Sequence, residues 1–131
     1  MSGTKSVLDS NAIIHASKGT IDAEQLLTGS ENYYVSIITL IEVYAYDFGT
    51  SVEKVIIDEI LDSLEIVELG KEIAEQTIIY RKNKNKKIKL PDAVILATAK
   101  FINADLITNN VSDFLSVDPS VNVVNLDEFK P

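Results

Sequence analysis

Cysteine is absent from the 131 residues of this chain, and histidine occurs only once, as His15. Without cysteine there is no disulfide, no thiolate metal site and no cysteine nucleophile. The same absence is typical of proteins of the reducing cytoplasm, which is the location we expect. His15 has no partner motif around it and is expected to be structural, so a general base must be a carboxylate or a metal-bound hydroxide.

Long apolar runs are also missing. No run approaches the ~18 residues that would cross a bilayer, so we expect no contact with the membrane interior. The N-terminal Met-Ser-Gly-Thr-Lys does not resemble a signal peptide. Apolar residues make up 46% of the chain, which is a globular composition, and this length is sufficient for one well-packed core. We therefore expect one domain over residues 1–131.

Positive charge is scarce, and it is unevenly spread. The net charge is −8, which alone argues against binding a polyanion. However, half of the twelve basic residues lie in the segment 81–89, "RKNKNKKIK". The sequence therefore describes an acidic body with one basic strip. Basic residues often surround the C-terminal end of a helix, so this strip is either a solvated helix end or a contact for a phosphate backbone.

Short apolar runs alternate with longer segments that have helical spacing. The predicted strands span residues 5–9, 33–36, 65–69, 105–108 and 122–126. The predicted helices span residues 10–18, 21–27, 37–48, 51–64, 71–84 and 90–103. In the helix 51–64 the periodicity favours a buried face. That predicted face consists of Val52, Val55, Ile56, Ile60 and Leu64.

This alternation predicts an α/β fold, with a mostly parallel sheet of about five strands in a three-layer α/β/α sandwich. Right-handed crossovers place the carboxyl ends of parallel strands on one edge of the sheet. Asp9, Ser36 and Thr108 each come at the end of a predicted strand, so the polar residues that follow these strands are expected at that edge. Topology alone does not place Glu42 or Asp92 there.

Carboxylates without histidine or cysteine support are typical of a site for a hard cation, since Mg²⁺ and Mn²⁺ prefer oxygen ligands. Several carboxylates in one cleft repel one another unless a cation or protons neutralise them. Two such ions can hold the attacking and leaving oxygens of a phosphodiester in line.

Four blocks of the sequence carry a resemblance to a known family. They are "VLDSNAIIH" (7–15), "VSIITLIEVYAY" (35–46), "KLPDAVILATA" (89–99) and "LITNNVSDF" (106–114). In order and in coverage they resemble the PIN-domain family, and among its stand-alone members the VapC-type toxin ribonucleases. The resemblance implies a Mg²⁺- or Mn²⁺-dependent endoribonuclease, with a cognate antitoxin protein as partner and a homodimer as the assembly.

The resemblance also implies roles for individual residues. The implied catalytic acids are Asp9, Glu42, Asp92 and Asp113. The implied metal ligands are Asp9, Asp92, Glu42 and Asn110. Many relatives have an aspartate where this chain has Asn110, which weakens a second metal position and leaves open whether Asn110 or Asp113 completes the site.

Further residues match supporting positions of the family or lie beside its third block. Asn11, Ser36 and Thr108 are expected to orient the acids by hydrogen bonds. The basic residues expected to contact RNA are Arg81, Lys82, Lys84, Lys86, Lys87 and Lys89.

Each of these expectations has a structural alternative. Asp9 could be only an N-cap, and Asp92 could only complement a helix dipole. Two other functions also remain open. One is an aspartyl phosphotransferase, which would need a lysine that the loop "NNVSDF" lacks. The other is a PIN-like module without activity that binds RNA or protein, an alternative that Asn110 keeps open.

Overall fold

The computed structural model describes residues 4–46 and 49–131, and the last two residues of the predicted helix 37–48 lie outside these ranges. The strands are β1 (Lys5–Leu8), β2 (Asn32–Ser36), β3 (Glu65–Val67), β4 (Asp105–Thr108) and β5 (Val123–Asn125). The helices are α1 (Ser10–Lys18), α2 (Ala23–Leu26), α3 (Ile37–Ala45), α4 (Ser51–Asp62), α5 (Lys71–Arg81), α6 (Leu90–Ile102), α7 (Val111–Leu115) and the 3₁₀-helix η1 (Leu126–Phe129).

The five strands form one sheet in the order β3-β2-β1-β4-β5, and every neighbouring pair is parallel. β1 lies in the centre, where Val7 pairs with Tyr34 on one side and with Leu106 on the other. Because all strands run the same way, their carboxyl ends lie along one edge. The predicted α/β sandwich with a parallel sheet of five strands is confirmed.

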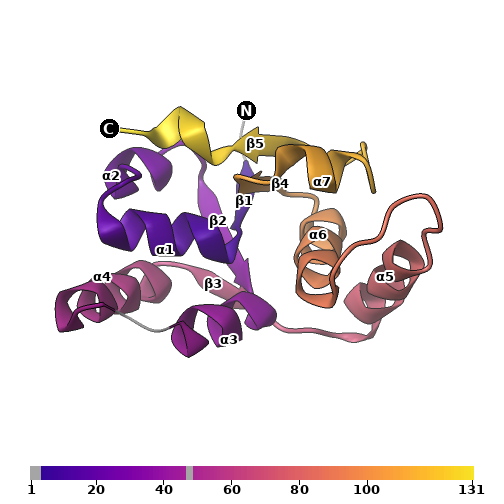
Figure 1. Cartoon of the computed structure of the whole chain (residues 1–131), viewed down its shortest axis with the longest axis horizontal. Coiled ribbons are helices and arrows are strands. Elements are labelled where there is room, and N and C mark those ends of the chain that lie inside the picture. Colours follow the sequence, from indigo (N-terminus) through magenta and orange to yellow (C-terminus); the bar gives the residue numbers. More distant parts are fainter. Residues whose placement is uncertain (1–3, 47–48) are drawn as a thin grey trace.

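Helices cover both faces of the sheet, as Figure 1 shows. Successive residues of a strand point to opposite faces, so Val7 and Leu8 enter different cores. The core around Val7 is completed by α5 and α6, and the core around Leu8 by α1 and α4. Leu106 and Ile107 of β4 divide between the same two cores. The chain thus has two apolar layers separated by the sheet.

The helix α6 is the most deeply buried helix in the described ranges. All residues from Ala93 to Ala99 are buried, and the helix packs against α5 and against the central strands. A helix that is apolar on all sides is typical of such a position. α6 is 13 residues long, and no helix in residues 4–46 and 49–131 has the length and apolarity to span a membrane.

The predicted buried face of the helix 51–64 is partly wrong. Ile60 and Leu64 are buried as expected, but Val52 and Val55 are 64% and 54% exposed. The residues that α4 buries besides Ile60 are Ile57 and Leu61. Both sets satisfy helical spacing, because β-branched residues occur around much of this helix, and only contact with α1 selects one of them.

The corrected face of α4 leads to a stability prediction. Ile57→Ala removes a fully buried side chain and should lower the free energy of unfolding by about 2–5 kcal/mol. Glu59→Ala, at an exposed position of α4, should change it by less than about 0.5 kcal/mol. Urea denaturation of both variants measures the difference, and equal losses at the two positions would show that the packing of α4 is misassigned.

Candidate functional site

Polar side chains gather where β1 and β4 end. Asp9 follows β1 directly, and Thr108 is the last residue of the neighbouring β4. Both side chains are buried, and the Thr108 hydroxyl donates a hydrogen bond of 2.7 Å to Asp9 Oδ2. The same Thr108 oxygen accepts from the amide of Asn110 at 3.1 Å. The predicted position of Asp9 and Thr108 at one edge of the sheet is therefore what the structure shows.

Asp9 is not held as an ordinary helix cap. It occupies the N-cap position of α1, yet its side chain makes no capping hydrogen bond. Burial raises the pKa of the Asp9 carboxyl, while hydrogen bonds from Thr108, from Ser10 and from the backbone amide of Asn11 oppose the rise. A buried carboxylate that is only partly satisfied is costly. A local capping role does not explain why the fold keeps an acid here.

Glu42 reaches the same place from α3. Ser36 ends β2 and begins α3, where its buried hydroxyl accepts from the amide of Ile38 at 3.2 Å. Glu42 lies about two turns further on, and its Oε1 is 3.1 Å from the hydroxyl of Ser10. That hydroxyl is also 3.3 Å from Asp9 Oδ1, so one proton is shared between two acids. Burial raises the pKa of Glu42, and the charge of Asp9 raises it further.

Asp92 is the third acid of this group. It lies in the first turn of α6, after Pro91, as the sequence predicts. Burial raises the pKa of Asp92 to about 6, and the charges of Asp9 and Glu42 add to the effect. The positive charge of Lys89 opposes it. α1 and α3 both begin near the middle of the view in Figure 1, beside α6. Asp9 at the start of α1, Asp92 in the first turn of α6 and Glu42 from within α3 therefore act on one another in one region.

These acids are close enough to interact but do not form a closed set of ligands. Among residues 4–46 and 49–131, no three acidic or histidine side chains are arranged as a ready metal-binding group. The donors are all oxygens, the ligands that Mg²⁺ or Mn²⁺ would need.

Asp113 and Asn110 lie at the rim of this acidic group. Asp113 is exposed on α7, where Lys86 pairs with it at 3.3 Å, and its charge contributes less to the pKa of Asp92 than those of Asp9 and Glu42. Asn110 is the N-cap of α7 but makes no side-chain cap bond. Asn110 and Asp113, the two candidates to complete the ligand set, thus both lie near the acids. Asn110 is neutral, so it would add no negative charge to the site.

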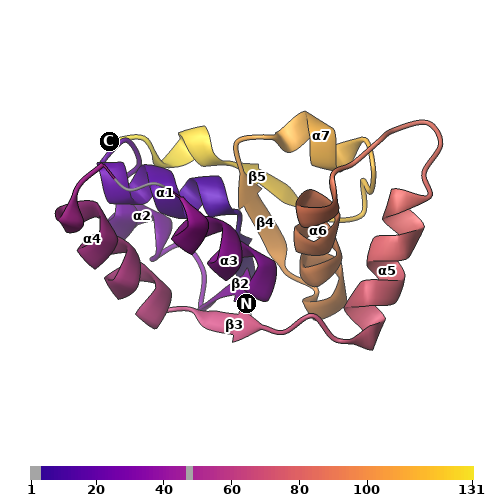
Figure 2. The same cartoon turned by 60° about the horizontal axis from the view of Figure 1, so that its bottom comes forward.

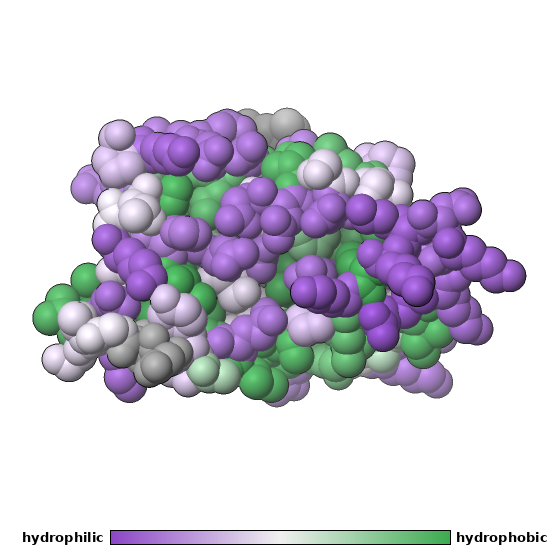
Figure 3. Space-filling view, in the orientation of Figure 1, coloured by the Kyte–Doolittle hydropathy of each residue, from purple (hydrophilic) through white to green (hydrophobic). Residues whose placement is uncertain are grey.

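The basic residues lie on the loop between α5 and α6, which arches beside α7 in Figure 2. Arg81 has a structural contact, because its guanidinium donates to the carbonyl oxygen of Ile88 at 2.6 Å. Lys82, Lys84 and Lys87 border a hollow of about 370 Å³. Figure 3 shows that hydrophilic residues dominate this side of the molecule. A larger hollow, about 650 Å³, lies at the amino ends of β2 and β3 and contains none of the predicted site residues.

Two polar residues at the acidic edge were not among the predicted site residues. Ser10 bridges Asp9 and Glu42, and its position directly after Asp9 was the only available signal. Asn109 accepts a hydrogen bond of 3.2 Å from the side chain of Asn11, which it meets across the sheet edge. The side chain of Asn11 therefore contacts Asn109, while the backbone amide of Asn11 hydrogen-bonds the Asp9 carboxyl and helps to lower its pKa.

Comparison with known proteins gives a family. The family model described as "PIN domain" matches residues 6–118. A toxin–antitoxin complex from Klebsiella pneumoniae contains a chain with 31% identity and a TM-score of 0.75, and the match covers 92% of this chain and 97% of that one. A comparison with curated proteins finds no match.

Two solved structures share the fold at lower identity. A chain of the DNA-bound VapBC from Salmonella typhimurium has 20% identity and a TM-score of 0.79, with 95% and 99% of the two chains covered. A chain of VapBC2 from Rickettsia felis, bound to a DNA fragment from its promoter, has 22% identity and a TM-score of 0.76, with 93% and 98% covered. The resemblance noted in the sequence is confirmed, and the chain belongs to the PIN-domain family, with the fold of VapC-type toxin–antitoxin proteins.

Proposed function

We propose that this protein is a Mg²⁺- or Mn²⁺-dependent endoribonuclease and the toxin of a type II toxin–antitoxin pair. The observation that carries the proposal is the meeting of Asp9, Glu42 and Asp92 at the carboxyl edge of a PIN fold. Each of these acids has its pKa raised, and the charges of the other two contribute to this for Asp92. Such a group favours a divalent cation over protons at neutral pH.

Asp9, Glu42 and Asp92 would hold the ion, and Asn110 or Asp113 would complete its ligands. A bound ion supplies Lewis-acid stabilisation of the phosphate and lowers the pKa of a bound water. The protein contributes orientation. Thr108 fixes Oδ2 of Asp9 and Ser10 fixes the spacing between Asp9 and Glu42, so the remaining carboxylate oxygens can turn toward a ligand.

The substrate would be RNA, with its phosphate backbone beside the α5–α6 loop. Lys84 and Lys87 are exposed there, and Lys89 is near enough to Asp92 to lower the pKa of its carboxyl. Basic side chains that line a path to a metal site attract and position a phosphate backbone. They also offset the net charge of −8, which would otherwise repel the substrate.

The partner would be an antitoxin protein, because the chain of 31% identity comes from a toxin–antitoxin complex. Such an inhibitor needs positive side chains to satisfy the carboxylates when it displaces the ion. The assembly would be a homodimer, for which Ile41, Tyr44, Val52 and Val55 provide exposed apolar surface on α3 and α4. We place this pair in the cytoplasm, where RNA is accessible.

A second candidate function is a binding module without activity. The amide of Asn110 in place of a fourth acid, together with the open spacing of the three acids, favours it. The two functions differ in one measurable property, which is metal-dependent cleavage of RNA.

Replacing the acids by amides tests the proposed chemistry. Asp9→Asn, Glu42→Gln and Asp92→Asn should each lower the rate of RNA cleavage in Mn²⁺ or Mg²⁺ by about 100-fold or more, since each removes a charged ligand. Gel-based cleavage of a mixed RNA measures the rates. Asp62→Asn and Glu59→Gln on α4 make the same chemical changes away from the site and should retain activity. Cleavage that continues in EDTA, or in all three site variants, would exclude the metal mechanism.

The raised pKa values predict an unusual dependence of stability on pH. A group that binds protons more tightly in the folded state destabilises the protein as pH rises from its unfolded pKa through its folded pKa. For Asp92 this window runs from about 4 to about 6, and after allowance for solvent screening the loss is about 1–2 kcal/mol. Denaturant titrations of metal-free protein at pH 4 and pH 7.5 measure it.

Two companion measurements distinguish this effect from general acid sensitivity. Asp92→Asn should make the metal-free protein more stable at pH 7.5 and should reduce the difference between the two pH values. Mn²⁺ should raise the melting temperature of the wild type at pH 7.5 and much less at pH 5, where protons compete for the carboxylates. A metal response that is unchanged in Asp92→Asn would argue against this ligand assignment.

The salt dependence of RNA binding tests the basic loop. The double variant Lys84→Gln/Lys87→Gln should bind single-stranded RNA more weakly, with a slope of log K against log salt reduced by about 0.7 for each lysine lost. Fluorescence anisotropy in EDTA measures binding without cleavage. Lys71→Gln on α5 is the matched control and should keep the wild-type slope, whereas an unchanged slope in the double variant would place the RNA elsewhere.

A further inference from the structure

A separate cavity opens at the same edge of the sheet, on the side of α1 away from the basic loop. It has a volume of about 280 Å³ and lies between α1 and the C-terminal η1. Its lining includes His15, Ile21, Asn109, Leu126, Asp127 and Lys130. None of the acids at the proposed metal site borders it. Its size suits a single planar ring system. The acids of the proposed metal site do not account for this cavity.

The cavity begins where the acidic group ends. Asn11 and His15 are four residues apart on α1, so they lie on the same face of the helix. Asn11 Nδ2 donates to Asn109 Oδ1 at 3.2 Å, and Asn109 itself borders the cavity. Asn11, two residues after Asp9, therefore connects this end of α1 to a residue that lines the cavity. His15 lies about 9 Å further along α1 than Asp9 at 1.5 Å per residue.

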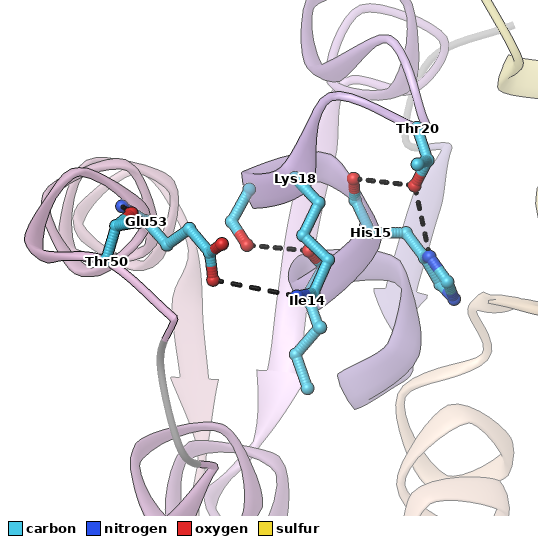
Figure 4. A network of polar contacts seen from close by, with 7 residues as sticks. Ile14, His15, Lys18, Thr20, Thr50 and Glu53 are labelled. Carbon is cyan, nitrogen blue, oxygen red and sulfur yellow. Dashed lines mark hydrogen bonds and ion pairs between the residues drawn. The ribbon is translucent and has the colours of Figure 1, made fainter.

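The contacts of His15 with Thr20 are compatible with a tautomer in which Nε2 is the hydrogen-bond acceptor. Thr20 has one hydroxyl proton and donates it to the carbonyl oxygen of His15 at 3.1 Å. With the Thr20 proton on that carbonyl, the contact of 3.1 Å between Thr20 Oγ1 and His15 Nδ1 makes Nδ1 the donor. In this tautomer of the neutral ring Nε2 is an acceptor. Figure 4 shows that this second nitrogen points away from Thr20, and it has no recorded partner within the described residues.

The floor and rim of the cavity favour a neutral, flat ligand over a phosphate. Ile21 and Leu126 are buried and give it an apolar floor. The two charged residues at the rim, Asp127 and Lys130, pair with each other at 3.4 Å and cancel. Because Asn109 Oδ1 already accepts from Asn11, the amide nitrogen of Asn109 is left as a donor. An acceptor at His15 and a donor at Asn109 thus stand above an apolar surface.

We propose that this cavity binds the base of an RNA nucleotide beside the scissile phosphate, and that His15 and Asn109 determine which base is preferred there. The edge of every RNA base carries at least one donor and one acceptor, which His15 Nε2 and the Asn109 amide can meet. Unstacked bases on apolar or aromatic surfaces are the usual targets of sequence-specific RNA recognition. The location beside the cut rests on the proposed function, but the binding of a base does not.

Binding can be measured without cleavage, because His15 is the only histidine in the chain. In EDTA, the imidazole signals of ¹⁵N-labelled protein should shift when AMP, CMP, GMP or UMP is added at up to about 10 mM, a range that detects weak binding. Lys130→Ala should alter the shifts, while Lys71→Ala should not. Equal shifts with ribose 5-phosphate, or none with any nucleotide, would overturn the assignment of a base site.

Cleavage mapping tests the role of His15 in specificity. The 5′ ends produced from a mixed RNA give the base preference at each position around the cut. His15→Ala should reduce the preference at one position by roughly 3- to 10-fold, which is the loss expected for one hydrogen bond. His15→Gln, which retains an acceptor, should recover part of it.

The two measurements separate failure of this inference from failure of the proposed nuclease. Nucleotide-dependent shifts of His15 in a protein that cuts no RNA would refute the nuclease and support the base site. RNA cleavage by wild type with an unchanged position profile in His15→Ala, together with no shifts, would refute the base site and leave the nuclease in place.

Discussion

The buried carboxylate of Asp9 is the constraint around which this edge of the fold is organised. An acid withdrawn from water at the end of the central strand is destabilising unless the protein or a ligand compensates it. Thr108 on the adjacent strand and Ser10 at the start of α1 each provide one hydrogen bond, which is partial compensation. The parallel sheet makes this possible, because it brings the ends of β1 and β4 together with little freedom to move.

The electrostatics of the other acids follow from that first burial. Glu42 shares the Ser10 proton with Asp9, so the two carboxylates cannot separate without breaking a hydrogen bond. Asp92 then faces two negative charges from a half-buried position, and its pKa is raised to about 6. Repulsion of this kind is relieved by a proton or a cation. The fold thus maintains a local excess of negative charge that has no role in stability and is consistent with a site for a ligand.

The parts of the structure that depend on local patterns could be predicted from the sequence. β4 has the predicted bounds, and Asp9 and Thr108 share an edge as the alternation of strands and helices requires. Glu42 and Asp92 could be placed at this edge only through the family resemblance. Glu42 lies two turns into a helix and Asp92 opens another helix, so the direction of each side chain depends on how these helices pack against the sheet. The buried face of α4 could not be predicted because apolar residues occur around the whole helix, so only its packing selects one face. The helix α7 could not be predicted because it is only five residues long.

The surfaces on the two sides of the acidic edge differ in chemistry, and this difference suggests how the proposed RNA substrate would lie across the edge. The basic loop belongs to the layer of α5 and α6, whereas the cavity at His15 belongs to the layer of α1. A single RNA strand that crosses the carboxyl edge of the sheet would meet charge on one side and an apolar, hydrogen-bonding surface on the other. Phosphate contacts do not depend on the nucleotide sequence, whereas contacts to the bases determine sequence specificity. Under the proposed function, affinity would come mostly from one face of the sheet and specificity from the other, with the acids between them.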